Sequence, residues 1–233
     1  MLKFRPQSPP MRFPIFICLS FTLLFLPGCF DLVEDISVHS DGSGSFLFLA
    51  NLSQSRIKLK TLMALDSVDG FKVPSVGQLT AEIEKATRLL SASDGITHVE
   101  NKKNFDDFIF SMHFDFRDVT CLNKALITLF VAFSPKGTPV PQSSFKLDSQ
   151  SFTCTDGYDA TKEKKKIPRK DLVLMGDANM TCIYRFDQSI AEFSNTDAKL
   201  SKNGKSVLLR VPVPDLVNGN KHLTNSIKFL ENK

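Results

Sequence analysis

The sequence predicts an α+β fold: an antiparallel sheet built from hairpins, with about three helices packed on one of its faces. Three observations lead to this prediction. The first is that apolar residues alternate along several short segments, and the second is that turn residues separate these segments. The third is that other segments carry apolar residues at helical spacing after a capping residue. We expect one α+β unit over 29–133, extended by a mostly β stretch over 134–233 that can share the same sheet.

The first hairpin is expected over residues 33–52. Ile36 and Val38 alternate with polar neighbours, and Ser40-Asp41-Gly42-Ser43-Gly44 supplies residues that tolerate positive φ. The chain then returns as a strand over 45–52. We interpret the acidic residues just before this hairpin, within 30–35, as a short tether.

Three helices follow from their caps and their apolar spacing. The first is expected over 53–65. The second begins after Ser75, which with Gln78 three residues later fits a capping box. The third begins after Asp118 and runs to Phe133, with leucines recurring along one side.

A second hairpin is expected from strands at 96–101 and 105–116, with its turn at 102–104. Its second strand has the clearest alternation in the chain, because five large apolar residues fall on one face: Phe108, Phe110, Met112, Phe114 and Phe116. The simplest interpretation is a sheet face buried under helices. The alternative is a face that binds a lipid or another ligand.

The second half is predicted to be mostly strands. We expect short strands at 145–147 and 151–153, a strand at 179–186, a hairpin over 198–211 around Asn203-Gly204, and a strand or short helix at 223–230. A helical turn is expected at 171–176. The basic run in 162–170 is interpreted as a solvated loop, with contact to anionic lipid or polysaccharide as the alternative.

The N-terminus has the form of a secretion signal. Three basic residues precede an apolar run over 13–26, which is short for a membrane span, and Leu26-Pro27-Gly28-Cys29 follows. These four residues resemble the lipobox of bacterial lipoproteins. The resemblance implies cleavage between Gly28 and Cys29 and a lipid on the sulfur of Cys29. An uncleaved N-terminal anchor is the alternative.

The wider pattern resembles uncharacterised envelope lipoproteins of the Bacteroidota and, more faintly, the LppM-type lipoprotein domain, which also opens with a hairpin carrying an Asp-Gly-Ser turn. The resemblance implies attachment to the membrane through Cys29, in the cell envelope and preferably at the outer membrane, with the face left open. Ser67, in Asp66-Ser67-Val68, fits the O-glycosylation signal of that phylum.

Composition argues against nucleic acid as a partner. The net charge is +4, but residues 1–28 hold three of the 29 basic residues and none of the 25 acidic ones. The rest of the chain is therefore close to neutral, without the basic excess that nucleic acid binding needs. We expect an envelope protein or a lipid as the partner.

The cysteines and histidines do not indicate a reaction centre. Cys154 and Cys182 could pair in a disulfide; the alternative is that they and Cys121 are small buried apolar side chains. The four histidines lack metal-ligand spacing, and no nucleophile motif is present. We therefore predict no catalytic, metal or cofactor residue.

Three functions remain. The first is a lipid-anchored, non-catalytic binding or scaffold protein of the envelope. The second is a carrier of lipid or another amphiphile that uses the Phe108–Phe116 face, which requires a cavity above that face. The third is an envelope hydrolase, which requires a cleft where histidines or carboxylates converge.

Overall fold

The computed structural model describes residues 30–68, 71–134, 138, 140, 143–155 and 177–231. The signal segment with Gly28 and Cys29, the basic run in 162–170 and the helical turn expected at 171–176 lie outside these residues. In the described part of the chain, no helix is both long and apolar enough to cross a membrane.

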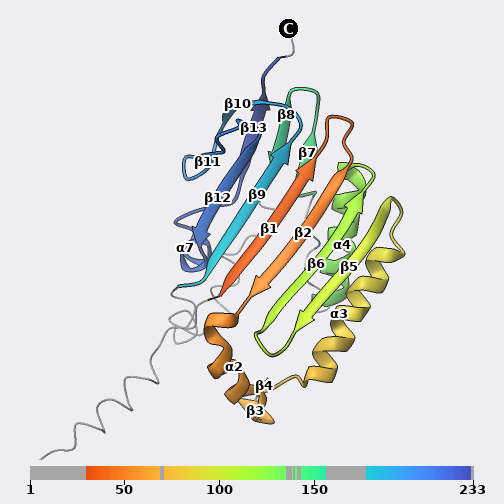
Figure 1. Cartoon of the computed structure of the whole chain (residues 1–233), viewed down its shortest axis with the longest axis vertical. Coiled ribbons are helices and arrows are strands. Elements are labelled where there is room, and N and C mark those ends of the chain that lie inside the picture. Colours follow the sequence, from red (N-terminus) through yellow and green to blue (C-terminus); the bar gives the residue numbers. More distant parts are fainter. Residues whose placement is uncertain are drawn as a thin grey trace, which may run out of the picture.

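A seven-stranded sheet is the central layer (Figure 1). Its strand order is β11-β12-β9-β1-β2-β6-β5. Neighbouring strands are antiparallel except β1 and β9, which are parallel. The strands are β1 (Asp31–Val38), β2 (Gly44–Asn51), β5 (Ile96–Asn104), β6 (Ile109–Phe116), β9 (Asn179–Phe186), β11 (Lys199–Leu200) and β12 (Ser206–Pro212).

One face of this sheet, here called the covered face, carries two kinds of cover. Helices α3 (Val76–Ser91) and α4 (Val119–Phe133) lie over the half with β5 and β6 (Figure 1). A second sheet of order β10-β13-β8-β7 lies over the half with β9 and β12. Its strands are β7 (Phe145–Leu147), β8 (Ser151–Cys154), β10 (Ile190–Phe193) and β13 (Asn225–Phe229).

Aromatic side chains join the two sheets. The ring of Phe152 in β8 lies 5.5 Å from Tyr184 and 5.4 Å from Phe186, both in β9. Phe46 and Phe114 stack at 5.0 Å under the helices. These contacts bury the alternating apolar positions that predicted the strands, and they form one continuous core.

A smaller group of elements lies at the end of the sheet where β1 begins and β2 ends (Figure 1). A 3-10 turn, Ser53–Ser55, leads into α2 (Arg56–Met63), and a two-stranded ribbon follows, β3 (Ser67–Val68) and β4 (Phe71–Lys72). The helix expected over 53–65 is therefore present, but it lies at the end of the sheet rather than on its face. The short helix α7 (Val213–Asn218), which the sequence analysis did not predict, follows β12.

Local signals in the sequence are confirmed. Ser75 and Gln78 form the reciprocal capping box, and the Asp118 carboxylate accepts a hydrogen bond from the Cys121 backbone N–H at 2.8 Å. The hairpins around Asp41-Gly42 and Asn203-Gly204 form. Of the strand or short helix expected within 223–230, the structure has the strand.

Two boundaries were wrong. The second hairpin turns at 105–108 instead of 102–104, because Asn104 accepts hydrogen bonds from the backbone N–H groups of Asp106 and Asp107 and ends β5 there. The acidic stretch read as a tether is the start of β1. Asp31 and Asp35 pair with Arg210 and Arg185 on the open face of the sheet, at 3.0 and 2.8 Å, and so are held in the strand.

Candidate functional site

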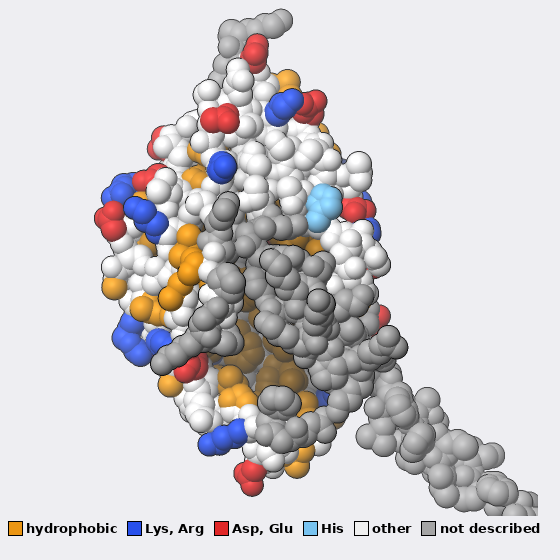
Figure 2. All heavy atoms as spheres, turned by 180° about the vertical axis from the view of Figure 1, so that it is seen from behind, with side chains coloured by type: hydrophobic (Ala, Val, Ile, Leu, Met, Phe, Trp, Pro, Cys, Tyr) orange, Lys and Arg blue, Asp and Glu red, His pale blue; other side chains and the backbone are white. Residues whose placement is uncertain are grey.

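An apolar groove separates the covered face of the sheet from α3 and α4. Its volume is about 570 Å³, within the range of roughly 300–1,000 Å³ that is usual for small-molecule sites. Figure 2, which views the molecule from this side, shows hydrophobic side chains gathered in a hollow in its lower half. The apolar lining residues are Phe46, Phe48, Phe110, Met112 and Phe114 from the sheet and Leu79, Ile83, Ala86, Leu126, Leu129 and Phe133 from the helices.

The groove exists because both helices pack tightly at only one end. In α3 the buried residue is Leu90, near the C-terminal end, whereas Leu79 and Ile83 are half-buried. In α4 the N-terminal half is buried, with Leu122 and Ala125 at 0% exposure, and Phe133 near the other end is 43% exposed. The large side chains of the sheet therefore keep one open side.

A second apolar pocket continues the groove toward α2. It measures about 440 Å³ and shares Leu79 and Phe110 with the first. Its remaining apolar lining comes from the inner side of α2, from the β3–β4 region and from the ends of β2 and the β5–β6 turn: Leu52, Leu59, Leu62, Met63, Val68, Val73, Pro74 and Phe108. The two pockets together give an elongated apolar path from the middle of the sheet to its α2 end.

Glu34 brings a carboxyl group to the inner end of this path. It is a β1 residue, paired in register with Phe48 on one side and Cys182 on the other. Burial raises the pKa of this carboxyl to about 7, and a hydrogen bond with Tyr184 opposes the rise. Glu34 is partly buried and is one of the residues that line the groove.

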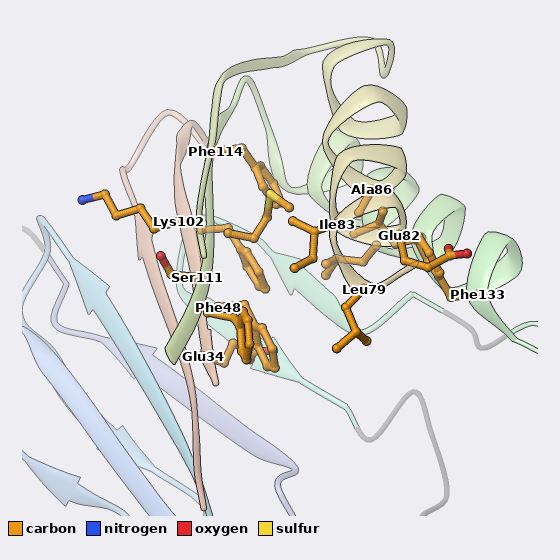
Figure 3. Close-up of a pocket in the computed structure, with 15 residues that line it drawn as sticks. Glu34, Phe48, Leu79, Glu82, Ile83, Ala86, Lys102, Ser111, Phe114 and Phe133 are labelled. Carbon is orange, nitrogen blue, oxygen red and sulfur yellow. The ribbon is translucent and has the colours of Figure 1, made fainter. Parts of the chain in front are cut away.

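The other polar residues at the groove direct their polar groups elsewhere (Figure 3). The Lys102 ammonium and the Ser111 hydroxyl point to the opposite side of the sheet, and the Glu82 carboxylate points outward from α3. Phe48, Phe114, Leu79 and Ile83 point into the space between sheet and helices. The groove is therefore an apolar surface with Glu34 at one end.

Part of the aromatic face predicted over Phe108–Phe116 is buried under the helices, and part of it lines the groove. Phe114 and Phe116 are buried, at 0% and 2% exposure, as a covered sheet face requires. Phe110 and Met112 are half-buried and line the groove. Phe108 is not in the strand: it sits in the turn with φ +55°, is 5% exposed and lines the second pocket.

Sequence reasoning missed Glu34. The residue was grouped with Asp31 and Asp35, although it alternates in step with Ile36 and Val38, which face the core. The strand period therefore placed one carboxylate on the covered face and its two acidic neighbours on the open face. The hairpin expected over 33–52 already contains Glu34, so the alternation with Ile36 and Val38 is the signal that identifies it.

The cysteines lie in the core, not at the groove. Cys121, Cys154 and Cys182 are buried thiols, and the disulfide considered for Cys154 and Cys182 is not formed in the structure. The Tyr184 hydroxyl oxygen lies 3.2 Å from the Cys154 sulfur, and this contact places Cys154 in the aromatic core. The interpretation of small buried side chains accounts for their positions.

Other predicted positions lie on the surface or outside the described residues. Ser67 is exposed in β3, and its glycosylation stays a prediction. On the open face the His98 ring contacts the Asp115 carboxylate at 2.8 Å. Within the residues that the structure describes, no group of three or more His, Cys, Asp or Glu residues has metal-binding geometry.

Comparison with solved structures gives matches of low sequence identity. The folded domain of Mycobacterium tuberculosis LppM is similar, with a TM-score of 0.45 and 12% sequence identity over 90% of this chain and 94% of that one. No protein-family model matches the sequence, and no curated protein matches it. The resemblance to Bacteroidota lipoproteins stays a prediction.

Proposed function

We propose that this chain is a lipid-anchored protein of the cell envelope that binds an amphiphile non-catalytically, with the apolar chain of the ligand in the groove under α3 and α4. The observation that carries the proposal is the groove itself. A scaffold role needs no cavity above the Phe110 face, whereas an amphiphile carrier does, and the cavity is there.

The lining favours a flexible hydrocarbon chain. Filling the groove removes the exposed parts of Phe48, Phe110 and Met112 from water, and each square ångström of apolar surface so buried contributes roughly 25 cal/mol. The extension past Leu79 and Phe110 toward α2 gives the site an elongated form. An acyl chain can follow such a path, whereas a rigid polar molecule would leave its hydrogen-bonding groups without partners.

A filled groove tests the binding role. Ala86→Phe places a ring in the groove from α3, and we expect it to weaken binding of the neutral fluorescent probe N-phenyl-1-naphthylamine by tenfold or more. Ala81→Phe, on the exposed side of the same helix, is the matched control and should bind as the unmodified chain does. Equal affinity of all three proteins would refute the proposed site, provided that circular dichroism shows them folded.

The anchor has its own test. Cells that express the chain and are fed an alkyne-labelled fatty acid should incorporate the label into this protein, and Cys29→Ser should abolish incorporation. A wild-type chain without label would end the lipoprotein part of the proposal. It would leave the groove and its probe binding untouched, so the two parts can fail separately.

A further inference from the structure

We propose that α2 and the residues directly after it are a membrane-docking surface that seats the α2 end of the groove on an anionic bilayer. This inference goes beyond the proposed ligand binding. It rests on the proposed lipid anchor for bringing the domain to the membrane and for orienting it there.

The position of β1, the first strand, determines which end of the domain faces the bilayer. Phe30 is already fixed to the sheet, because its carbonyl accepts a hydrogen bond from the Asn179 backbone N–H at 3.0 Å. Cys29 is the preceding residue in the sequence. A lipid on its sulfur would therefore enter the bilayer beside the end of the sheet where β1 begins.

The same end of the sheet carries α2. Asp31 of β1 pairs in register with Asn51, the last residue of β2, and α2 follows after the short 3-10 turn. An ion pair between Arg56 and Asp107, at 3.0 Å, ties the start of α2 to the β5–β6 turn. The start of β1 and α2 thus lie at the same end of the sheet (Figure 1).

The two sides of α2 have different surroundings. Leu59, Leu62 and Met63 line the second pocket. Ile57 is 78% exposed on the outer side, and Leu65, just after the helix, is 48% exposed. An exposed large aliphatic residue beside a wall of the groove is unfavourable in water but is stabilised at the headgroup boundary of a bilayer.

The charge of α2 complements an anionic surface. The helix contains Arg56, Lys58 and Lys60 and no acidic residue. Asp66 follows the helix, and Figure 2 shows acidic as well as basic and hydrophobic side chains at this end. Arg56 is already paired with Asp107, so Lys58 and Lys60 supply the attraction. A basic residue near an anionic bilayer strengthens attachment by roughly fivefold, and the two lysines therefore outweigh Asp66.

Docking would place the groove where its proposed ligand resides. The second pocket is lined by α2 and the β3–β4 region and adjoins the main groove, with which it shares Leu79 and Phe110. With α2 on the bilayer, an acyl chain could pass from the membrane into the groove with little exposure to water. The membrane contact and the apolar path are thus at the same end of the fold.

The test uses the lipid-anchored chain in vesicles of phosphatidylcholine and phosphatidylglycerol. Thr61→Cys carries an environment-sensitive nitrobenzoxadiazole label one helical turn from Ile57, on an exposed site. Lys202→Cys carries the same label in the turn before β12, at the opposite end of the sheet. We expect spin-labelled lipids to quench the label at position 61 strongly and the label at position 202 weakly.

Variants of the charged and apolar residues of α2 then distinguish contact of α2 with the bilayer from mere proximity of the anchored domain to it. Ile57→Ser, or Lys58→Glu with Lys60→Glu, should lower the ratio of docked to undocked protein at least about tenfold. Lys199→Glu with Lys205→Glu, two exposed lysines at the opposite end, is the matched control and should leave it unchanged. Quenching at position 61 that equals quenching at 202, or that neither α2 variant lowers, would overturn the inference.

A salt titration of the labelled chain, without the α2 substitutions, keeps the test valid if an α2 variant fails to fold. Raising the ionic strength screens the basic residues and should reduce quenching at position 61, whereas salt-independent quenching would contradict an electrostatic contact. Binding of N-phenyl-1-naphthylamine in the groove is measured separately without vesicles. A failure of docking is therefore distinguishable from a failure of the proposed ligand site.

Discussion

Glu34 accepts a hydrogen bond from the hydroxyl of Tyr184 in the core beneath the groove. The two residues come from the parallel pair β1 and β9, in which Glu34 is in register with Cys182 and Ile36 with Tyr184. Burial disfavours the charged carboxylate more than this single hydrogen bond favours it, so the pKa rises to about 7. An ionisable group with this pKa at the end of an apolar groove makes both stability and binding depend on pH.

The unfolding free energy is expected to fall as the pH rises from about 4.5 to about 7. The folded pKa of Glu34 lies above its ordinary value of 4.5, so in this window the folded chain holds a proton that the unfolded chain has lost. The contribution is fully present below the lower value and is lost above pH 7, at a cost of about 3 kcal/mol. Glu34→Gln removes this slope and should be more stable than the unmodified chain at pH 8 by a similar amount.

Urea unfolding at a series of pH values from 4 to 8 measures this difference. Glu82→Gln is the matched control, because the Glu82 side chain is 59% exposed and points away from the groove. It should follow the pH dependence of the unmodified chain. The assignment to Glu34 would be wrong if Glu34→Gln kept the same slope between pH 4.5 and 7.

Binding of a neutral apolar ligand should weaken as the pH rises. A ligand in the groove excludes water from Glu34 and so raises the pKa of its carboxyl further, since the charged form loses hydration. By linkage, affinity above pH 7 falls by about tenfold for each further unit by which the ligand raises the pKa. Titration of the chain with N-phenyl-1-naphthylamine at pH 6 and pH 8 should show this loss.

Glu34→Gln should bind this probe equally at both pH values. The probe stays uncharged across this range, so a pH effect reports the protein and not the ligand. A loss of affinity that persists in Glu34→Gln would assign the effect to another group.

The sequence predicted what local chemistry determines. The caps at Ser75 and Asp118 and the turns around Gly42 and Gly204 each act within a few residues, and all four form. The parallel pairing of β1 with β9 has no such signal. It is held in part by the ion pair of Arg185 and Asp35, which are 150 residues apart in the sequence. Hairpin turns predict only antiparallel pairs of consecutive strands.

The sequence predicts only part of the groove. Alternation in β6 identifies the surface that lines it, but alternation alone does not distinguish a covered sheet face from a binding face. Whether the helices close on Phe110 depends on where α3 and α4 diverge, which is set by burial at Leu90 and Leu122 rather than by any local motif. The position of Glu34 follows from its alternation with Ile36 and Val38, but its raised pKa depends on burial by the helices and the second sheet.

Gly44 is expected to be essential to the first hairpin. A Cβ atom built on it would lie 1.9 Å from the Ser37 carbonyl oxygen and 2.6 Å from the Phe116 ring. Ser37 pairs with Ser45 beside it, and Phe116 is opposite Gly44 in β6, so neither atom can move without disturbing two strand pairs. Gly44→Ala should therefore lower the free energy of unfolding by about 3 kcal/mol or more.

Gly77→Ala provides the opposite expectation in the same experiment. Gly77 lies in the first turn of α3, where the nearest atom to an added Cβ is the Ser75 hydroxyl oxygen at 3.8 Å. Alanine reduces the entropy lost on folding without a clash and should stabilise the chain by about 0.5–1 kcal/mol. Urea unfolding measures both changes. A Gly44→Ala protein as stable as the unmodified chain would mean that β1, β2 and β6 do not approach one another as closely as the structure shows.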